Sequence, residues 1–282
     1  MSQNSFGHWQ AVALLWNRIG APLRPCPEDA ALMRECVLRY AAKGRDALDG
    51  LPLGVTPEIA SQEWGCRMRL VAVDHVYAMV AGIWPGNTPW RSAICADWLR
   101  LPLRAAAFDL ALADGSLTTQ PFPAGYGKLA AALSTCLKPE GIFIARAFCR
   151  PAETESVENV FTLLRQGRIR SFHAFKWRLA MAVQGDNPGR GACLADIWEA
   201  YRRRIADHVD LVAETGWPRE EIATIDTYRD SRVCYSFPSE DETVAAMSEH
   251  FTCVERREGH YELAERCPTL AFTRRSTLKC PV

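Results

Sequence analysis

The sequence carries no excess of charge of either sign, because its 33 Lys and Arg residues balance its 33 Asp and Glu residues. Polyanion-binding proteins usually need a basic surface, so this balance argues against a dedicated nucleic-acid binder. No apolar run approaches the roughly 20 residues that a membrane-spanning helix needs. The first ten residues also lack the basic start and apolar stretch of a secretory signal. We therefore expect no membrane association.

Closely paired cysteines are missing as well. The eleven cysteines are an odd number and spread from Cys26 to Cys280 without a CxxC pair. Metal sites and disulfide frameworks usually show tighter spacing, so we predict free thiols, no metal site and a cytoplasmic location. The apolar share of 48% and the charged share of 23% are those of an ordinary globular protein. At 282 residues the chain can form one large domain or one domain with a sizeable insertion.

The pattern along the chain divides it into four parts. Residues 1–45 show helical spacing at 8–19 and 29–43, and we expect them to pack on the core or to cover a site. Residues 46–150 alternate short apolar runs with helical stretches, which is typical of βαβ units and a parallel sheet. The predicted strands are Ala47–Leu53, Arg69–Val73, Ser92–Ala96, Phe108–Ala113 and Gly141–Phe148. The predicted helices between them are Pro57–Trp64, Val76–Ile83 and Ala124–Leu137.

The second half of the chain changes character twice. Residues 151–230 are predicted to form a helical insertion or cap after the fifth strand. Residues 231–282 are predicted to return to the core sheet, with strands in SRVCYSF, FTCVERRE and PTLAFTRR and a helix capped by Ser239. The predicted fold is therefore α/β. It has a Rossmann-like, mainly parallel sheet with helices on both faces, N-terminal helices and a helical insertion.

In an open parallel sheet the ligand lies beyond the carboxyl ends of the strands, so the turns that follow them are the first places to look for a site. After the first strand, Gly54 lets a ligand approach the backbone. Thr56 suits a helix N-cap and Pro57 the first helical position, which would direct free N–H groups toward a ligand. A plain strand–turn–helix junction is the alternative interpretation.

Acidic residues follow the second and third strands. Asp74, sixteen positions after Glu58, could accept hydrogen bonds from the two hydroxyls of a ribose, or could simply cap a helix that begins near His75. Asp97 and Trp98 could accept from an adenine amino group and stack on the ring. The alternative interpretation is that Asp97 is a turn residue and Trp98 is a core residue.

The fourth strand opens into Asp114, Gly115 and Ser116. This tip lies in the middle of the predicted sheet, where Asp114 and Ser116 could orient an acceptor or the amino acid end of a cofactor. An Asp–Gly turn without a ligand is the alternative.

The order of these segments resembles the class I S-adenosylmethionine-dependent methyltransferases over roughly Leu48–Phe148. The segments are LGVTPEIA, RLVAVDHVYAMV, AICADWLRLPL, AFDLALADGSLT and LKPEGIFIARAF. The last of them is the most characteristic, with a helix that ends at Leu137–Gly141 before an apolar strand. One departure concerns the first loop, where the family has a strand-terminal acid and two or three glycines. This chain has Leu53 and the single Gly54 there.

The resemblance implies S-adenosylmethionine as the cofactor. It places Gly54 and Thr56 against the methionine part, Asp74 at the ribose and Asp114 facing the methyl donor. It places Asp97 and Trp98 at the adenine. The predicted cofactor-binding residues are Gly54, Thr56, Glu58, Asp74, His75, Asp97, Trp98, Asp114 and Gly115.

Methyl transfer depends mainly on alignment of the reacting atoms, and a base is needed only when the acceptor must lose a proton. His173 is the first candidate for that base, with a structural histidine as the alternative, and Asp114 is the second predicted catalytic residue. The aromatic residues at 172–177 could wall an acceptor pocket or form a helix core. Trp9 and Trp16 are further candidates for contact with the acceptor. The run Tyr201–Arg204 could meet an anionic acceptor or form a solvated helix face.

These observations predict a methyltransferase that acts on a small-molecule acceptor. The alternatives are a methyltransferase acting on a peptide, protein or RNA, and a catalytically silent protein that binds the cofactor and works through a partner. Nicotinamide-dependent oxidoreduction is disfavoured because the first turn lacks a G-x-G-x-x-G pattern. A homodimer is left open as an assembly state.

Overall fold

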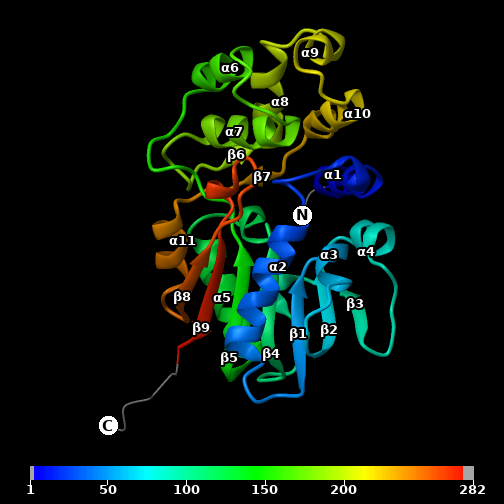
Figure 1. The fold of residues 1–282 in the computed structure, drawn as a ribbon, viewed down its shortest axis with the longest axis vertical. Coiled ribbons are helices and arrows are strands. Elements are labelled where there is room, and N and C mark those ends of the chain that lie inside the picture. Colours follow the sequence, from blue (N-terminus) through cyan, green and yellow to red (C-terminus); the bar gives the residue numbers. More distant parts are fainter. Residues whose placement is uncertain (1–2, 276–282) are drawn as a thin grey trace.

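The computed structural model describes residues 3–275, and its centre is one seven-stranded sheet (Figure 1). The strands run parallel to one another except for one, the sixth in spatial order, which runs antiparallel to both of its neighbours. In that order the strands are β3 (Arg91–Cys95), β2 (Arg67–Asp74), β1 (Ala47–Leu53), β4 (Phe108–Asp114), β5 (Leu137–Arg146), β9 (Thr269–Arg274) and β8 (Phe251–Arg257). The predicted mainly parallel sheet is confirmed.

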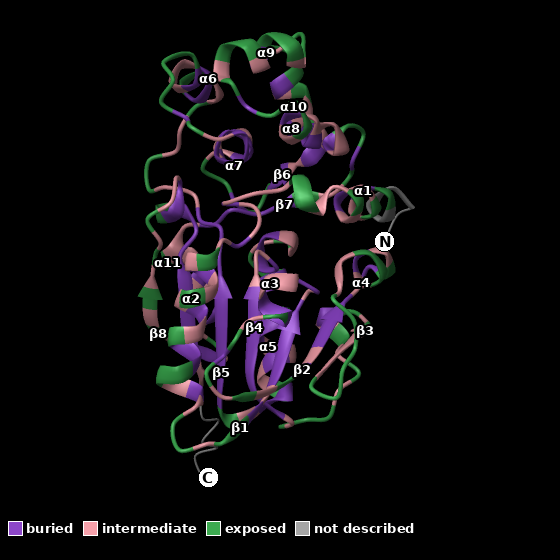
Figure 2. Ribbon diagram, turned by 45° about the vertical axis from the view of Figure 1, so that its right-hand side comes forward, coloured by how far each residue is buried: buried purple, intermediate pink, exposed green. Residues whose placement is uncertain are grey.

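Helices cover both faces of the sheet, and the central strand explains why. In β4, Ala111 and Ala113 belong to one apolar cluster, while Leu110 and Leu112 belong to another on the opposite face. Side chains alternate between faces along a strand, so an unbroken apolar run needs cover on both sides. Figure 2 shows these central strands as buried. One face is covered by α5 (Ala124–Cys136) and α11 (Glu240–Met247), the other by α2 (Pro27–Cys36), η2 (Val37–Ala41) and α3 (Pro57–Ala60).

A group of helices above the sheet, here called the cap, follows β5 (Figure 1). Its interior is aromatic, with Phe172, Phe175, Tyr201 and Trp217 packed together and buried. The predicted insertion is thus present. It consists of α6 (Val157–Arg165), α7 (Phe172–Gln184), α8 (Leu194–Arg202), α9 (His208–Thr215), α10 (Arg219–Ile222) and η5 (Ala223–Tyr228).

One predicted core strand is not in the core sheet. In SRVCYSF only two residues are extended, as β7 (Cys234–Tyr235), and they pair antiparallel with β6 (Ala192–Cys193) in a separate ribbon beside the cap. Cys193 and Cys234 face each other there and form a disulfide. The prediction of free thiols is therefore wrong for this pair. The two cysteines are 41 positions apart, so local spacing could not reveal them.

The two N-terminal helices belong to different parts of the molecule. Helix α1 (Gln3–Leu14) packs against α4 (Tyr77–Ile83) and against η5 of the cap, whereas α2 packs on the sheet. Figure 1 shows α1 between the cap and α4. A short helix, η1 (Trp16–Arg18), follows α1. The N-terminal section therefore helps to close the space between sheet and cap.

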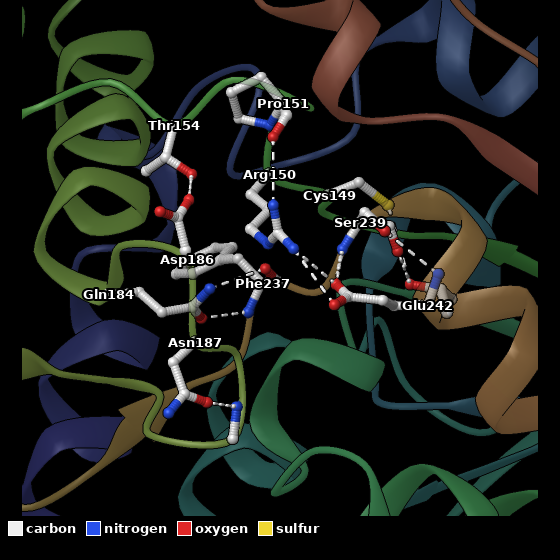
Figure 3. Close-up of polar contacts among 12 residues, drawn as sticks. Cys149, Arg150, Pro151, Thr154, Gln184, Asp186, Asn187, Phe237, Ser239 and Glu242 are labelled. Atoms are coloured by element: carbon white, nitrogen blue, oxygen red, sulfur yellow. Dashed lines mark hydrogen bonds and ion pairs between the residues drawn. The ribbon is translucent and has the colours of Figure 1, made fainter.

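The chain crosses between sheet and cap at two neighbouring segments, which Figure 3 shows. Arg150, just after β5, donates to both carboxylate oxygens of Glu242 at 3.1 Å. The Gln184 amide at the end of α7 donates to the Phe237 carbonyl at 2.8 Å and accepts from the Phe237 N–H at 2.7 Å. Ser239 caps α11 as predicted. These bonds hold the two crossing segments together below the cap.

Candidate functional site

A single cavity lies between the carboxyl edge of the sheet and the cap. Its lower wall comes from the turns after β1, β2 and β4, and its upper wall from α7, η5 and β7. Helices α1 and α4 line it from the side. At this edge β1 pairs with β2 on one side and β4 on the other, and this reversal of strand order is the usual ligand position in such sheets.

The turn after β1 leaves open space beside Asp74. Gly54 has φ +103°, a backbone conformation that favours glycine, and its N–H donates to the Val73 carbonyl at 2.7 Å. A Cβ at this position would lie 4.0 Å from Asp74 Oδ2 and 3.9 Å from Thr56 Oγ1. Both of those side chains line the cavity. Thr56 is the N-cap residue of α3 as predicted, but its side chain makes no capping bond.

Asp74 divides its two carboxylate oxygens between two environments. Oδ1 accepts from the Val76 N–H at 2.8 Å, in the turn that leads into α4. Oδ2 is the oxygen that faces Gly54. Burial raises the pKa of the Asp74 carboxyl to about 6. The N-cap residue of α4 is Val76 and no side chain caps that helix, so the helix-cap interpretation of Asp74 is wrong, and Oδ2 is left for a ligand.

Trp98 and His75 form an aromatic corner beside Asp74. The Trp98 indole N–H donates to the Val73 carbonyl at 2.6 Å, which fixes the ring against the end of β2. His75 meets this ring edge-on, with 5.3 Å between centroids. Both residues line the cavity, whereas Asp97 does not. The Asp97 carboxylate accepts from Leu99 N at 2.9 Å and caps η3 (Trp98–Arg100).

The turn after β4 connects the sheet side of the cavity with the cap. The Ser116 hydroxyl donates to the Leu53 carbonyl at 2.7 Å and joins the tips of β4 and β1. Gly115 has φ +64°, and a Cβ there would lie only 2.5 Å from the Phe148 ring. Asp114 and Gly115 line the cavity, and so does Phe148.

Asp114 is engaged by a buried arginine. Arg146, fully buried at the end of β5, donates through Nε to Asp114 and through Nη1 to the Pro22 carbonyl at 2.7 Å. Asp29 of α2 lies 3.3 Å from the same Nη1. Burial raises the pKa of the Asp114 carboxyl, and Arg146 opposes that shift. This cluster ties the N-terminal link to the sheet directly behind the cavity.

Besides Asp97, two more predicted site residues lie outside the cavity lining. Glu58 forms an ion pair with Arg24, and its Oε2 is buried without a partner among the described residues. His173 is buried in α7, and its Nε2 lies 3.0 Å from the Arg18 carbonyl. Burial lowers the pKa of the His173 imidazole to about 3. The structure thus groups seven of the nine predicted cofactor residues at one cavity and separates His173 from it.

The predicted acceptor residues divide in the same way. Trp9, Trp16 and Trp177 line the cavity, while Phe175 and Tyr201 lie in the interior of the cap. Sequence reasoning missed a further group of cavity-lining residues, which comprises Phe148, Lys176, Thr224, Thr227, Tyr228 and Tyr235. A lysine within the apolar run AFKWRLA was the one available signal.

Within residues 3–275 no group of three or more His, Cys, Asp or Glu side chains could hold a metal ion. No helix in that range is long and apolar enough to cross a membrane.

Comparison with known proteins gives the fold. No protein-family model and no curated protein matches the sequence. A putative zinc-dependent alcohol dehydrogenase from Rhodobacter sphaeroides aligns with TM-score 0.64 and 12% identity over 98% of this chain and 100% of its own. The N-methyltransferase NodS from Bradyrhizobium japonicum WM9, solved with S-adenosylhomocysteine, aligns with a TM-score of 0.51 and 14% identity. The alignment covers 96% of this chain and 98% of NodS.

A third solved structure is the putative methyltransferase in complex with the Trm112 activator from Haloferax volcanii. It gives a TM-score of 0.53 and 10% identity over 97% of both chains. At such low identities these likenesses establish the fold alone. The chain has the Rossmann-like fold of the class I S-adenosylmethionine-dependent methyltransferases, as the sequence predicted.

Proposed function

We propose that the chain is an S-adenosylmethionine-dependent methyltransferase that acts on a small-molecule acceptor. The observation that carries this proposal is the single cavity that runs from the turns after β1, β2 and β4 into the cap. One end has the features expected for the nucleoside of the cofactor. The other end is enclosed by aromatic residues.

The residues at the sheet edge suit S-adenosylmethionine. Asp74 Oδ2 faces the space that glycine leaves at position 54, where it could accept from the hydroxyls of a ribose. His75 and Trp98 supply aromatic surface next to it for an adenine ring. Asp97, close in sequence to Trp98, stays a proposed partner of the adenine amino group.

The methionine end of the cofactor would lie nearer to β4. Gly54, Thr56 and Gly115 offer backbone and hydroxyl groups there, and Asp114 offers a carboxylate beside Arg146. Glu58, whose Oε2 is buried and without a described partner, stands in the segment where the family's strand-terminal acid is missing. We propose Glu58 as the compensating carboxylate for the ammonium group.

When bound, S-adenosylmethionine supplies an already activated methyl group, so the protein mainly has to align the acceptor and exclude water. The cap, α1 and the aromatic side chains Phe148 and Trp177 perform both tasks in this proposal. Asp114 lines the cavity and is better placed than His173 to contact an acceptor. The side chain of His173 is directed to the Arg18 carbonyl instead.

Enclosure favours a small molecule over a macromolecule. Residues of α7, η5 and β7 in the cap region form the upper wall of the cavity, and Trp177 and Tyr235 in that wall are almost fully buried. A peptide or RNA acceptor would need an open groove instead. Incubation with labelled S-adenosylmethionine and size-fractionated extract should label small molecules. Labelling confined to macromolecules would contradict the small-molecule proposal, and S-adenosylhomocysteine binding without any labelling would favour the silent-binder alternative.

Ligand-dependent thermal unfolding tests the cofactor proposal. S-adenosylhomocysteine should raise the melting temperature by mass action, whereas NAD should not. Asp74→Asn can retain the hydrogen bond from the Val76 N–H but loses the charged acceptor, so it should lose most of the shift. Asp49→Asn is the matched control, because Asp49 pairs with Arg69 away from the cavity. A shift with NAD alone, or an unchanged shift in Asp74→Asn, would contradict the proposal.

A further inference from the structure

The upper end of the cavity is an aromatic chamber that encloses a lysine. Trp177 meets Phe148 edge-on at 5.1 Å and Tyr235 at 5.5 Å, and Tyr235 lies 6.4 Å from Tyr228. All four rings line the cavity, together with Lys176. We call this end, defined by Lys176, Trp177, Tyr228, Tyr235 and Thr118, the Lys176 chamber. Thr118 belongs to it because its carbonyl accepts from the N–H of Ser236, next to Tyr235.

The ammonium group of Lys176 has no counter-ion among the described residues. Its side chain is 2% exposed, and Nζ donates to Thr224 Oγ1 at 2.9 Å. Nζ also lies 5.1 Å from the centre of the Tyr228 ring and 5.7 Å from that of Phe172. The Thr224 hydroxyl itself donates to the Glu221 carbonyl, so it is free to act as an acceptor toward Lys176. One hydrogen bond and two ring faces leave part of the charge uncompensated.

This arrangement is costly for a purely structural side chain. An ammonium group removed from water without a carboxylate loses several kcal/mol of solvation, whereas a methionine would fill the same space at no such cost. Burial accordingly lowers the pKa of the Lys176 ammonium to about 7. An anion that enters the chamber would compensate the charge.

The neighbouring histidines do not provide that compensation. His8 Nδ1 is 3.0 Å from the Thr227 carbonyl, and His173 Nε2 is bonded to the Arg18 carbonyl. Each of these nitrogens must therefore carry a proton and act as a donor. Burial lowers the pKa of both imidazoles, to about 4 for His8, so both are neutral near pH 7.

Two further polar groups in the chamber lack partners. The indole N–H of Trp177 and the hydroxyl of Thr118 are buried, and neither has a hydrogen-bond partner within residues 3–275. Buried polar groups are nearly always paired, so these two donors can take up the oxygen of a water or of a ligand. With Lys176, the chamber presents three hydrogen-bond donors and flat aromatic walls.

We propose that the Lys176 chamber binds a planar aromatic acceptor through an anionic oxygen, a phenolate, enolate or carboxylate, for which Lys176 is the counter-ion. The aromatic walls contact the ring faces and edges, and Trp177 and Thr118 donate to further oxygens of the same molecule. This assignment rests on the proposed function, since it names the acceptor class for the same cavity.

Matched pairs of probes test the charge requirement. 4-Nitrophenol has an oxygen that can ionise, whereas the methylated oxygen of 4-nitroanisole cannot. In the second pair, benzoate carries a charged carboxylate and benzamide is its neutral counterpart. Binding is measured by absorbance or calorimetry near pH 7, where Lys176 still carries a proton in a large share of the molecules, with and without S-adenosylhomocysteine. The native protein should bind at least one anionic probe tenfold or more tightly than its neutral partner. The anionic probe that binds more tightly then shows whether the chamber prefers a phenolate or a carboxylate oxygen.

Lys176→Met should remove this preference while leaving the thermal shift caused by S-adenosylhomocysteine unchanged. Lys128→Met, which alters an exposed lysine of α5, is the control and should behave as the native protein. Thr224→Val, which removes the acceptor for Nζ, should weaken the preference several-fold and provides a second variant if Lys176→Met does not fold.

Equal binding within each pair by the native protein, no binding of any probe, or a preference that survives in Lys176→Met would overturn the inference. A missing thermal shift with S-adenosylhomocysteine would overturn the proposed function instead. The probe titration without that ligand still tests the chamber in that case.

Discussion

The two ends of the cavity are built in different ways. The proposed cofactor end comes from residues at the end of a strand or just past it, such as Asp74, Gly54 and Gly115, and backbone hydrogen bonds hold its turns in place. The acceptor end brings together side chains from α7, η5 and β7, which are up to about 60 residues apart. The first depends on local chain geometry and the second on how the cap packs. Changes at the two ends should therefore have separable effects on cofactor and acceptor.

The largest expected effect is at Gly115, where the two ends meet. Gly115→Ala adds a Cβ 2.5 Å from the Phe148 ring at φ +64°, so strain and overpacking together should lower the free energy of unfolding by about 3 kcal/mol. Chemical denaturation measures it. In a double-mutant cycle, Phe148→Leu should recover part of the loss. Strict additivity would show that the two ends are not in contact there.

The second effect is on pH stability. The unfolded chain protonates His173 near pH 6.5, whereas the folded imidazole stays neutral until about pH 3, so stability falls as the pH drops below 6.5. At pH 5 this amounts to about 2 kcal/mol relative to pH 7. His173→Gln, which can keep the bond to the Arg18 carbonyl, should lack that share of the loss. Denaturant midpoints at both pH values measure this difference. An equal loss of stability in the native protein and in His173→Gln would contradict the claim that His173 is buried in its neutral form.

The third and smaller effect distinguishes backbone strain at a glycine position from the loss of the space that glycine leaves for a ligand. Gly54→Ala places a methyl group beside Asp74 Oδ2 and should weaken S-adenosylhomocysteine binding about tenfold, or about 1.4 kcal/mol. Gly44→Ala is the matched control, since Gly44 also has positive φ but open space around it. It should lose stability but not affinity. Equal calorimetric affinities for the two variants would show that position 54 does not border the ligand.

The smallest expected effect is at Asp97. Asp97→Asn can keep the cap to Leu99 N, and if the carboxylate turns to accept from the adenine amino group, affinity should fall a few-fold, by less than about 1 kcal/mol. Comparing S-adenosylhomocysteine with its N6-methylated analogue gives a second measurement. An unchanged affinity in both comparisons would restrict Asp97 to its capping role.

The difference between the two ends also explains what the sequence could predict. The first five strands follow from periodicity, and the positions of Asp74 and Gly54 follow from the turns after them. Ser239 predicted the cap of α11 from local chemistry, and the structure adds Glu242 as its partner in a capping box. SRVCYSF was assigned to the wrong sheet because its partner, β6, lies within the insertion.

The acceptor end was not predictable for a similar reason. His173 was predicted as the base and Lys176 was not considered, yet α7 directs His173 to the Arg18 carbonyl and brings Lys176 to the cavity. Which face of α7 turns inward depends on packing against α6 and α8. No local pattern specifies that packing.

A crystal structure with bound S-adenosylhomocysteine tests the central claim most directly. The account predicts that the ribose hydroxyls lie within hydrogen-bond distance of the Asp74 carboxylate, that the adenine contacts Trp98, and that the sulfur faces the space leading to Lys176. Ligand density elsewhere on the protein, or within the Lys176 chamber in place of the sheet edge, would contradict it.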